Sequence, residues 1–269
     1  MSGIERIAEA FAAARAEGRR AALMPYLMGG FPGVPASRDI GLAYAAAGAD
    51  LVELGIPFSD PLADGPVIHA AAVSALAAGA RVAEVLGVAA EIATRVPVVV
   101  MCYSNPIYVR GPERFADALV QAGVSGVIVP DLPLEEAAGL LEVCDVRGLA
   151  LVPLVAPTTP EARLALIGSR ARGFLYTVSL TGTTGERAAL DGGLRGVLAR
   201  AAASTEVPVA VGFGIGTPEQ AAAAAAAGAD GVIIGTRLVR AAGEADDPAA
   251  AVAELVRGFS AALRAPVLG

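Results

Sequence analysis

The sequence predicts an α/β protein, a (β/α)₈ barrel in one domain over residues 1–269 with an extra N-terminal helix. A helix–glycine–strand join recurs along the chain, short β-branched runs alternate with Ala-rich helical stretches, and no Gly/Ser-rich linker interrupts the alternation. Alternating strands and helices form parallel sheets. Eight such units in about 250 residues are typical of a closed barrel. A doubly wound open sheet remains the alternative, because periodicity does not distinguish closed from open sheets.

The recurring join is clearest in "AAAGADLVELGIP" (45–57) and "AAAGADGVIIGTR" (225–237). A looser copy is "LVQAGVSGVIVPD" (119–131). Each copy begins in an Ala-rich helix and stops at a glycine, the residue that tolerates the left-handed conformation in which many helices end. A β-branched run follows at once, so each copy predicts a helix, a cap and a strand, with the short connection that α/β units use.

The elements follow in order after an amphipathic first helix. The segment "MSGIERIAEAFAAARAEGRR" interleaves acids with arginines and lacks the basic-then-apolar order of a signal peptide. Strands are expected at 22–28, 50–54, 97–102, 126–130, 150–155, 173–178, 208–212 and 231–235. Helices are expected at 36–48, 67–77, 82–95, 112–122, 134–147, 160–169, 190–204 and 217–227.

Composition excludes several classes of function. The net charge is −7 and no basic tract occurs, which argues against a nucleic-acid partner. No run approaches about 20 apolar residues without Gly, Pro or charge, so no membrane span is expected. Cys102 and Cys144 have neither metal-site spacing nor a disulfide framework; they are expected to pack as small hydrophobes in a protein of the reducing cytoplasm. The chain has no lysine, which excludes Schiff-base chemistry on a lysine amine.

The segment "LVELGIPFSDPLADGP" (51–66) places a carboxylate in an apolar strand. Side chains alternate across a strand, so if Val52 and Leu54 face the helices, Glu53 faces the barrel interior. Burial raises a carboxyl pKa, which suits a general acid–base group near neutral pH. The structural alternative is that Glu53 pairs with a buried Arg or a backbone N–H.

Two further acids, Asp60 and Asp64, follow in the proline-rich loop after this strand. Prolines stiffen the loop, which can fold back over the mouth of the barrel. Barrel chemistry resides in such loops at the C-terminal ends of the strands. The ordinary alternative is that each Asp caps a turn or a helix, Asp64 the helix that starts near Pro66.

Glycines gather in the loops after the seventh and eighth expected strands, "VGFGIGTPEQ" (211–220) and "IIGTRL" (233–238). Loops at these places often hold phosphate in barrels. Glycines let the backbone approach a ligand, and a helix is expected to begin after each loop, so two helix N-termini are expected to converge on one anion. Arg237 either adds charge there or faces solvent. The residues expected at this phosphate end are Gly212, Gly214, Gly235 and Thr236.

The loop after the sixth strand, "SLTGTTGER" (179–187), is read either as a mobile lid with Thr184 as its polar contact or as a disordered surface loop. Tyr176 is expected to face inward with Phe174 and Val178 and to present its hydroxyl to a ligand. His69 is the single histidine, and its place early in a helix favours a structural or surface role.

Together these residues resemble the tryptophan synthase alpha chain family. The most specific segment is "ELGIPFSDPLADGP", and "CYSNP" (102–106), Tyr176 and "GFGI" follow in the family's order over essentially the whole chain. The resemblance implies a barrel that cleaves indole-3-glycerol phosphate into indole and glyceraldehyde 3-phosphate. It also implies a cytoplasmic α₂β₂ complex in which indole passes to a beta chain that carries pyridoxal phosphate, with no cofactor or metal in this chain.

The resemblance implies roles for individual residues. Glu53 would move protons to and from indole C3 and the glycerol hydroxyl, and Asp64, oriented by Thr184, would steady the indole N–H as positive charge develops. The other implied positions are Gly185, Gly212, Gly214, Gly235 and Thr236 at the phosphate, Tyr26 and Phe213 beside the indole, Tyr176 beside Glu53, and Asp60 and Asn105 near the beta-chain contact.

The implied chemistry agrees with these residue types. Retro-aldol cleavage needs indole C3 protonated so that the ring accepts electrons, and a second carboxylate stabilises the cation that forms. Departures from the family pattern leave the reaction assignment intact. They are Met28-Gly29 where many relatives carry Thr, Thr183 where Val is commoner, and Gly216 and Thr236 where serine is usual.

Three other functions stand as alternatives. A sugar-phosphate isomerase of the histidine-pathway type would carry aspartates at the ends of the first and fifth strands, where this chain has Met28-Gly29 and 155–157, "VAP". A partner that binds ligand without catalysis is disfavoured by intact Glu53 and Asp64. A stand-alone lyase that releases free indole would use the same residues, so only activity without a partner separates it from a synthase subunit.

Overall fold

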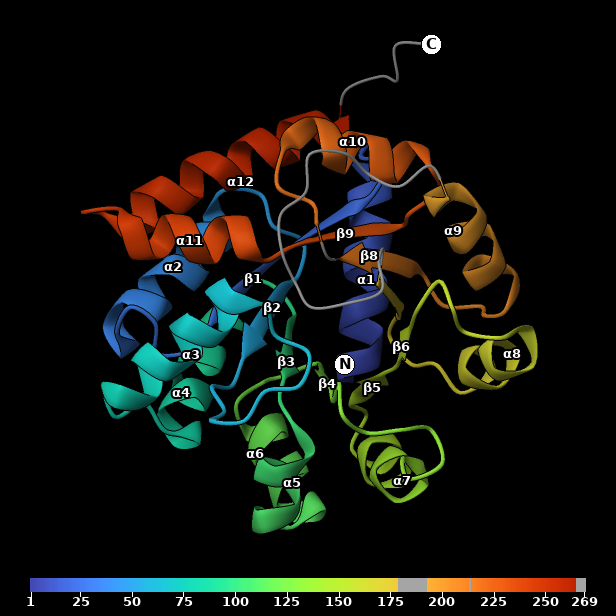
Figure 1. Cartoon of the computed structure of the whole chain (residues 1–269), viewed down its shortest axis with the longest axis horizontal. Coiled ribbons are helices and arrows are strands. Elements are labelled where there is room, and N and C mark those ends of the chain that lie inside the picture. The colour runs from blue at the N-terminus through green and yellow to red at the C-terminus, as the bar shows by residue number, and fades with distance from the viewer. Residues whose placement is uncertain (179–192, 213, 265–269) are drawn as a thin grey trace.

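Parallel strands dominate the computed structural model, which describes residues 1–178, 193–212 and 214–264. Nine strands form one sheet in the order β5-β4-β3-β2-β1-β9-β8-β7-β6 among the described residues (Figure 1). The strands are β1 (Ala22–Met28), β2 (Val52–Gly55), β3 (Val98–Met101), β4 (Gly126–Ile128), β5 (Ala150–Val152), β6 (Leu154–Val155), β7 (Leu175–Val178), β8 (Val209–Gly212) and β9 (Gly231–Ile234).

The sheet closes into the expected barrel. β1 pairs in parallel with both β2 and β9, so the first and last strands are neighbours. β5 and β6 stand at opposite ends of the sheet order, yet only Pro153 separates them in the chain. This geometry confirms the barrel and excludes the open doubly wound sheet. The single strand expected over 150–155 is interrupted because proline has no N–H for the ladder.

Helices cover the outer face of the sheet (Figure 1). Those described are α1 (Gly3–Ala16), α2 (Val34–Ala46), α3 (Pro66–Ala77), α4 (Val82–Ile92), α5 (Ser104–Arg110), α6 (Pro112–Gln121), α7 (Ala138–Val146), α8 (Glu161–Ser169), α9 (Leu194–Ala203), α10 (Pro218–Ala226), α11 (Thr236–Glu244) and α12 (Pro248–Arg264). α5 and α12 lie outside the helical ranges expected from the sequence. α7 begins later than expected, because 133–137 form turns closed by the Glu136 N–H to Pro133 carbonyl bond.

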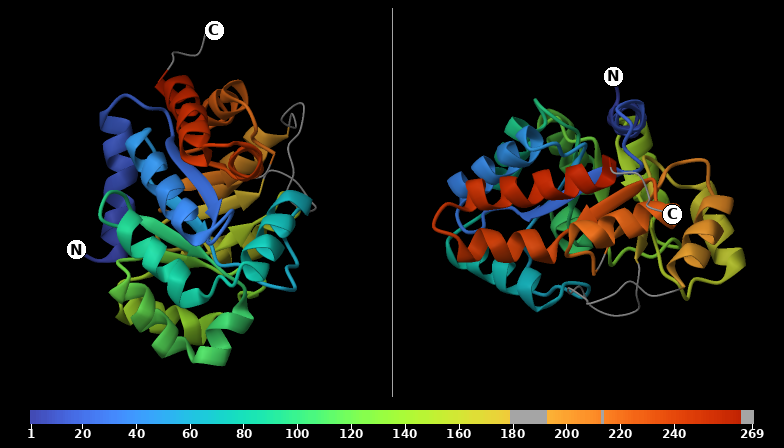
Figure 2. Two further views of the ribbon diagram at one scale, coloured as in Figure 1. Left: turned by 90° about the vertical axis from the view of Figure 1, so that its left-hand side faces the viewer. Right: turned by 90° about the horizontal axis from the view of Figure 1, so that it is seen from above.

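α1 closes one end of the barrel, as Figure 2 shows from above. Its buried residues Ile7, Phe11 and Ala14 pack with interior side chains, and the ring centroids of Phe11 and Phe174 lie 6.0 Å apart. A capping box between Ser2 and Glu5 starts the helix. The amphipathic first helix predicted from the sequence is therefore present, and it leaves the opposite end of the barrel for a ligand.

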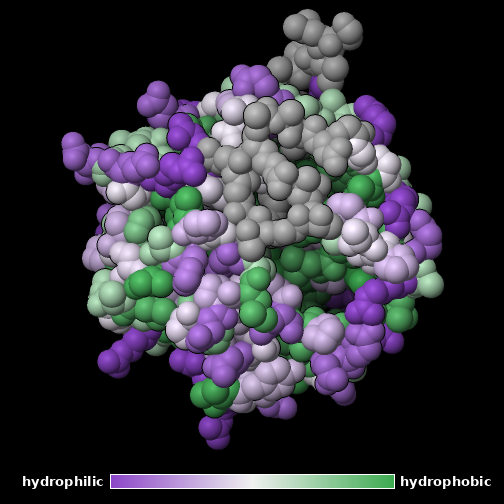
Figure 3. Space-filling view, viewed as in Figure 1, coloured by the Kyte–Doolittle hydropathy of each residue, from purple (hydrophilic) through white to green (hydrophobic). Residues whose placement is uncertain are grey.

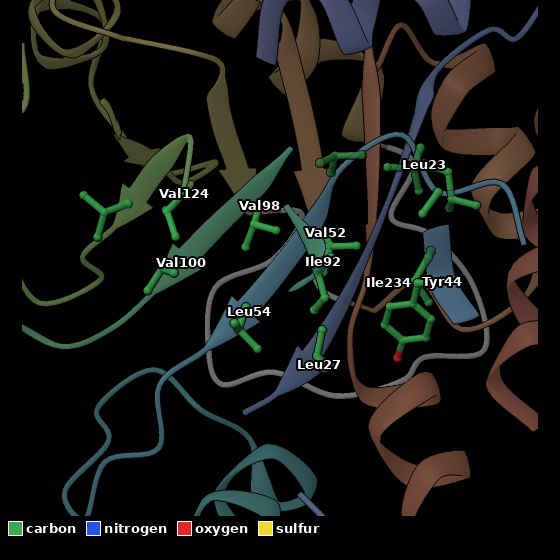
Figure 4. Close-up of a cluster of buried hydrophobic side chains, with 14 of the residues drawn as sticks. Leu23, Leu27, Tyr44, Val52, Leu54, Ile92, Val98, Val100, Val124 and Ile234 are labelled. Atoms are coloured by element: carbon green, nitrogen blue, oxygen red, sulfur yellow. The ribbon is translucent and has the colours of Figure 1, made fainter. Parts of the chain in front are cut away.

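The strands carry two apolar layers, as their alternation requires. Val52, Leu54 and Val98 point outward into the core between the sheet and the helices, where Tyr44 and Ile92 meet them (Figure 4). Leu51 and Val99 belong to the separate cluster inside the barrel. Glu53 lies between Val52 and Leu54 in the strand, so it faces inward.

The repeated helix–glycine–strand join has a structural purpose that composition did not reveal. Gly48 and Gly228 have φ of 103° and 111°, the left-handed region expected of them. The aspartate two residues later accepts from a backbone N–H at the start of a neighbouring strand. Asp50 accepts from Leu23 N at 2.8 Å, and Asp230 accepts from Val209 N at 2.9 Å. The repeat thus aligns neighbouring strands at the end of the barrel opposite the mouth.

Arg19 is expected to be required for stability. It is 7 % exposed, and its guanidinium lies 2.6 and 2.7 Å from the two carboxylate oxygens of Asp50, which is 8 % exposed. Arg19→Met leaves a buried carboxylate without its ion-pair partner, which we expect to lower the free energy of unfolding by about 3 kcal/mol in urea denaturation. Arg38→Met, at an exposed pair with Asp39, should change it by less than about 0.5 kcal/mol. Equal effects of the two substitutions would contradict this account.

Candidate active site

A cavity opens where the strands end, on the face of the molecule seen in Figure 3, where apolar residues border a hollow. β1, β2, β3, β6, β7 and β9 contribute to it, together with the loops that follow β2, β4, β8 and β9. The structure brings together seven of the residues that the sequence singled out: Tyr26, Glu53, Asp64, Tyr176, Gly214, Gly235 and Thr236.

Glu53 is the buried acid of this cavity. It is 1 % exposed, and its Oε2 has no hydrogen-bond partner among the residues that the structure describes. No arginine in that part of the chain pairs with it, so the structural alternative of a buried ion pair is not observed. Burial, and then the neighbouring Asp64 charge, raise the pKa of Glu53 to about 8. The side chain therefore holds a proton at neutral pH.

Asp64 reaches the same cavity from the loop after β2. Its Oδ1 accepts a hydrogen bond of 3.0 Å from the Tyr103 hydroxyl. α3 has Gly65 as its N-cap, and the hydrogen bond described for the Asp64 side chain is with Tyr103, so the capping alternative is not what the structure shows. Burial raises the pKa of Asp64, while the Tyr103 hydrogen bond and then His69 lower it. A deeply buried proton donor and a less buried carboxylate therefore share one cavity.

Two tyrosines flank the acids, one from β1 and one from β7. Tyr26 is opposite Glu53 in the β1–β2 register, and Tyr176 comes from β7. A Cβ on Gly55 would collide with the Tyr26 hydroxyl, and one on Gly212 would collide with the Tyr176 hydroxyl. Burial first, and then nearby acidic groups, raise the pKa of both tyrosines well above the usual range, so both stay protonated. Gly212 thus makes room for Tyr176 beside the cavity.

The phosphate end is built around the start of α11. Gly235 is the N-cap of α11 and Thr236 its first residue, and both line the cavity with Gly214. Thr217, the N-cap of α10, lines a second hollow together with Arg237 from the first turn of α11. Gln220 Oε1 accepts from Gly216 N at 2.7 Å and from Thr217 N at 3.2 Å. Gly235 and Thr236, and not Thr217, therefore line the cavity that holds Glu53.

Comparison with known proteins decides what this arrangement is. Residues 11–264 match the family model of the tryptophan synthase alpha chain. The chain belongs to that family. A tryptophan synthase alpha chain of Prochlorococcus marinus (strain MIT 9313) is 48 % identical over 236 residues, which are 87 % of this chain and 86 % of that one. One from Methanosarcina mazei is 45 % identical over 242 residues, 90 % of this chain and 88 % of that one.

Solved structures agree with this assignment. A Mycobacterium tuberculosis tryptophan synthase structure superposes with a TM-score of 0.91 at 37 % identity, covering 97 % of this chain and 99 % of that one. The Pyrococcus furiosus tryptophan synthase α₂β₂ complex gives a TM-score of 0.83 at 36 % identity, covering 88 % of this chain and 97 % of that one. The resemblance drawn from the short motifs is therefore confirmed.

Some positions that the tryptophan synthase resemblance assigns lie outside the described residues, and others are described but lie away from the cavity. Phe213, Thr184 and Gly185, with the loop 179–187, lie outside the described residues. Asp60 and Asn105 are exposed, on the loop after β2 and in α5, and neither lines the cavity. Their positions are open to a partner chain.

Sequence reasoning missed the rest of the cavity wall, and it missed Tyr103, which contacts Asp64. Tyr103 lies two residues after β3 in the "CYSNP" motif, a place where a barrel loop carries chemistry, so it could have been singled out. The remaining wall residues are apolar or small and gave no separate signal: Ala63, Ile68, Met101, Pro130, Leu154, Ile215 and Ile233. They form a surface suited to an aromatic ring.

His69 and the two cysteines occupy the structural positions expected of them. His69 is exposed on α3, while Cys102 and Cys144 are free thiols buried in the outer core. Among the described residues, no group of three or more His, Cys, Asp or Glu could hold a metal ion. Within the same residues, no helix is by itself long and apolar enough to cross a membrane; α3 and α4 pass that test only as a pair bent by 112°.

Proposed function

We propose that this cavity binds indole-3-glycerol phosphate and cleaves it to indole and glyceraldehyde 3-phosphate, with Glu53 and Asp64 as its catalytic residues. The alpha chain family carries out this reaction in tryptophan synthesis. The observation that supports the residue roles best is Glu53, buried without an ion-pair partner among the described residues, in one cavity with Asp64 and an apolar wall. Such a pair places a proton donor and a negative charge beside an aromatic ring.

The two carboxyl groups have separate tasks. Protonated Glu53 gives its proton to indole C3, and the positive charge that develops at the ring nitrogen is stabilised by ionised Asp64, which accepts the N–H hydrogen bond. The C–C bond to the glycerol then breaks, and its electron pair restores the aromatic ring. Glu53, now a carboxylate, takes the proton of the glycerol hydroxyl as that carbon becomes the aldehyde, so the acid is regenerated.

The residues that line the cavity would bind the indole ring and the phosphate group of the substrate at opposite ends. Tyr26 and the apolar side chains contact the indole ring, and Tyr176 packs beside Glu53. Backbone N–H groups at Gly235 and Thr236, where α11 begins, bind the phosphate with Gly214, assisted by the helix dipole. No arginine lines the cavity in the described part of the chain, which makes backbone groups the main source of phosphate affinity there.

The chain acts with a beta chain as an α₂β₂ tryptophan synthase and needs no cofactor, since pyridoxal phosphate belongs to the beta chain. Exposed Asp60 and Asn105 are the proposed contacts. Residues 1–269 form a single catalytic domain in this proposal, and two free buried thiols favour the cytoplasm.

Indole release from indole-3-glycerol phosphate tests the proposal. We expect slow turnover by the purified chain. Turnover should be faster when the beta chain is added, because the chain acts as a subunit of the α₂β₂ complex. Fast turnover alone with no acceleration by the beta chain would favour the stand-alone lyase. A complete lack of turnover in every mixture would leave a binding subunit and overturn the catalytic roles of Glu53 and Asp64.

A further inference from the structure

Tyr103 is a hydrogen-bond partner of Asp64 that sequence reasoning left without a role. It lies two residues after the end of β3, is the N-cap residue of α5, and is 4 % exposed. Its hydroxyl donates to Asp64 Oδ1 and accepts from the Ala63 N–H, each at 3.0 Å. One phenol oxygen thus holds both the backbone and the side chain at the end of the loop that carries Asp64.

The ring of Tyr103 contacts the beginning of the same loop. It stacks on Phe58, with ring centroids 5.3 Å apart and an interplanar angle of 29°. Phe58 comes six residues before Asp64, so Tyr103 fastens this loop at two separate points. Within the described residues, the Tyr103 hydroxyl makes the one hydrogen bond recorded for the Asp64 carboxylate.

The backbone next to Tyr103 is itself anchored to the barrel. Asp131, just after β4, accepts from Ser104 N at 2.8 Å and from Ser104 Oγ at 2.7 Å. The start of α5 is therefore fixed to the next strand around the ring. A tyrosine on an anchored backbone can hold a loop in one orientation. Without it, the loop would lose conformational entropy each time it became ordered around the substrate.

We propose that Tyr103 is a positioning residue, whose hydroxyl holds Oδ1 of Asp64 so that Oδ2 faces the indole N–H. The inference rests on the proposed function, because it needs Asp64 to stabilise positive charge on indole. Since that charge develops on the way to the transition state, loss of the orientation lowers kcat and leaves KM nearly unchanged.

The charged groups around Asp64 provide a second test of the positioning role, the pH dependence of the reaction. Burial raises the pKa of Asp64 and His69 from α3 lowers it, while Glu53 from β2 holds a proton and Tyr26 from β1 is neutral. The Tyr103 hydrogen bond lowers the pKa of Asp64, so removing it raises that pKa. Asp64 has to be ionised to stabilise the cation. The acidic limb of the kcat/KM profile therefore moves to higher pH when the hydroxyl is removed.

Tyr103→Phe tests the proposal, because it keeps the stack on Phe58 and removes only the hydroxyl. With saturating beta chain, we expect kcat for indole release to fall by about 10- to 100-fold, KM to change by less than about 3-fold, and the acidic limb to shift upward. Tyr108→Phe is the matched control; it removes a phenol hydroxyl that is 49 % exposed on the same helix, and should behave as wild type with and without the beta chain.

A double-mutant cycle with Asp64→Asn separates positioning from loss of fold. If Tyr103 acts through Asp64, adding Tyr103→Phe to Asp64→Asn lowers single-turnover indole release by less than about 2-fold more. Additive losses, or an unchanged kcat and acidic limb in an active enzyme, would overturn the positioning role and leave the proposed function standing. A rise in KM alone would overturn it too. Absence of indole release by wild type would instead refute the function itself.

Discussion

Glu53→Gln is expected to lower kcat for indole release by about 1,000- to 10,000-fold in the presence of the beta chain, the upper part of the range for general acid–base catalysis. Glutamine keeps the size of the side chain and resembles the protonated acid, so the cavity and the barrel remain intact. The amide cannot give a proton to indole C3 or take one from the glycerol hydroxyl. Substrate binding should survive, so KM should change little.

Steady-state indole release measures this effect, and Glu9→Gln is its control. Glu9 is exposed on α1, at the closed end of the barrel, so the same exchange there should leave turnover unchanged. Glu53→Gln with more than about a tenth of wild-type kcat would show that Glu53 does not carry the proton transfers. A loss of substrate binding equal to the loss of turnover would assign Glu53 a binding role instead.

The same substitution is expected to stabilise the fold at alkaline pH. Burial raises the pKa of Glu53 from 4.5 to about 8, so between these values the folded protein holds a proton that the unfolded chain has released. The favourable contribution of protonated Glu53 is complete below pH 4.5 and is lost as pH rises to about 8. Glu53→Gln never ionises and escapes this loss. Its free energy of unfolding should exceed that of wild type by on the order of 4 kcal/mol at pH 8.

Urea denaturation across that pH range measures the difference. The gain should grow with pH and vanish near pH 4, where Glu53 is protonated in both states, and Glu9→Gln should show no such trend. A difference between Glu53→Gln and wild type that does not depend on pH would mean that Glu53 has an ordinary pKa in the folded protein. This result would mean that the catalytic acid Glu53 lowers the free energy of unfolding at the pH at which the enzyme works.

Much of the barrel could be predicted because local pattern and fold agree. β1 occupies the range expected of it, and the glycines of the repeated join adopt the predicted left-handed conformation at Gly48 and Gly228. Closure could not be predicted, since it depends on pairing between β1 and β9, which are far apart in the chain. α5 escaped notice because seven residues with a proline among them give too few turns for a helical period.

The position of a site residue was predictable where the alternation of one strand determines which way its side chain points. Alternation along β2 was enough to turn Glu53 inward, because Val52 and Leu54 had to face the helices. The partner of Asp64 was not predictable, since Tyr103 reaches it from another loop. The bonds from Gly216 N and Thr217 N to Gln220 Oε1 were not predictable either, since the glycine-rich pattern of that loop does not specify side-chain partners.

Infrared difference spectroscopy shows whether Glu53 is a neutral acid at physiological pH, on which its role as proton donor depends. A protonated carboxylic acid has a C=O stretch that a carboxylate lacks, and the difference between wild type and Glu53→Gln isolates the band of Glu53. We expect this band to be present at pH 7 and to disappear as pH rises through about 8. A spectrum in which Glu53 is already ionised at pH 6 would contradict it.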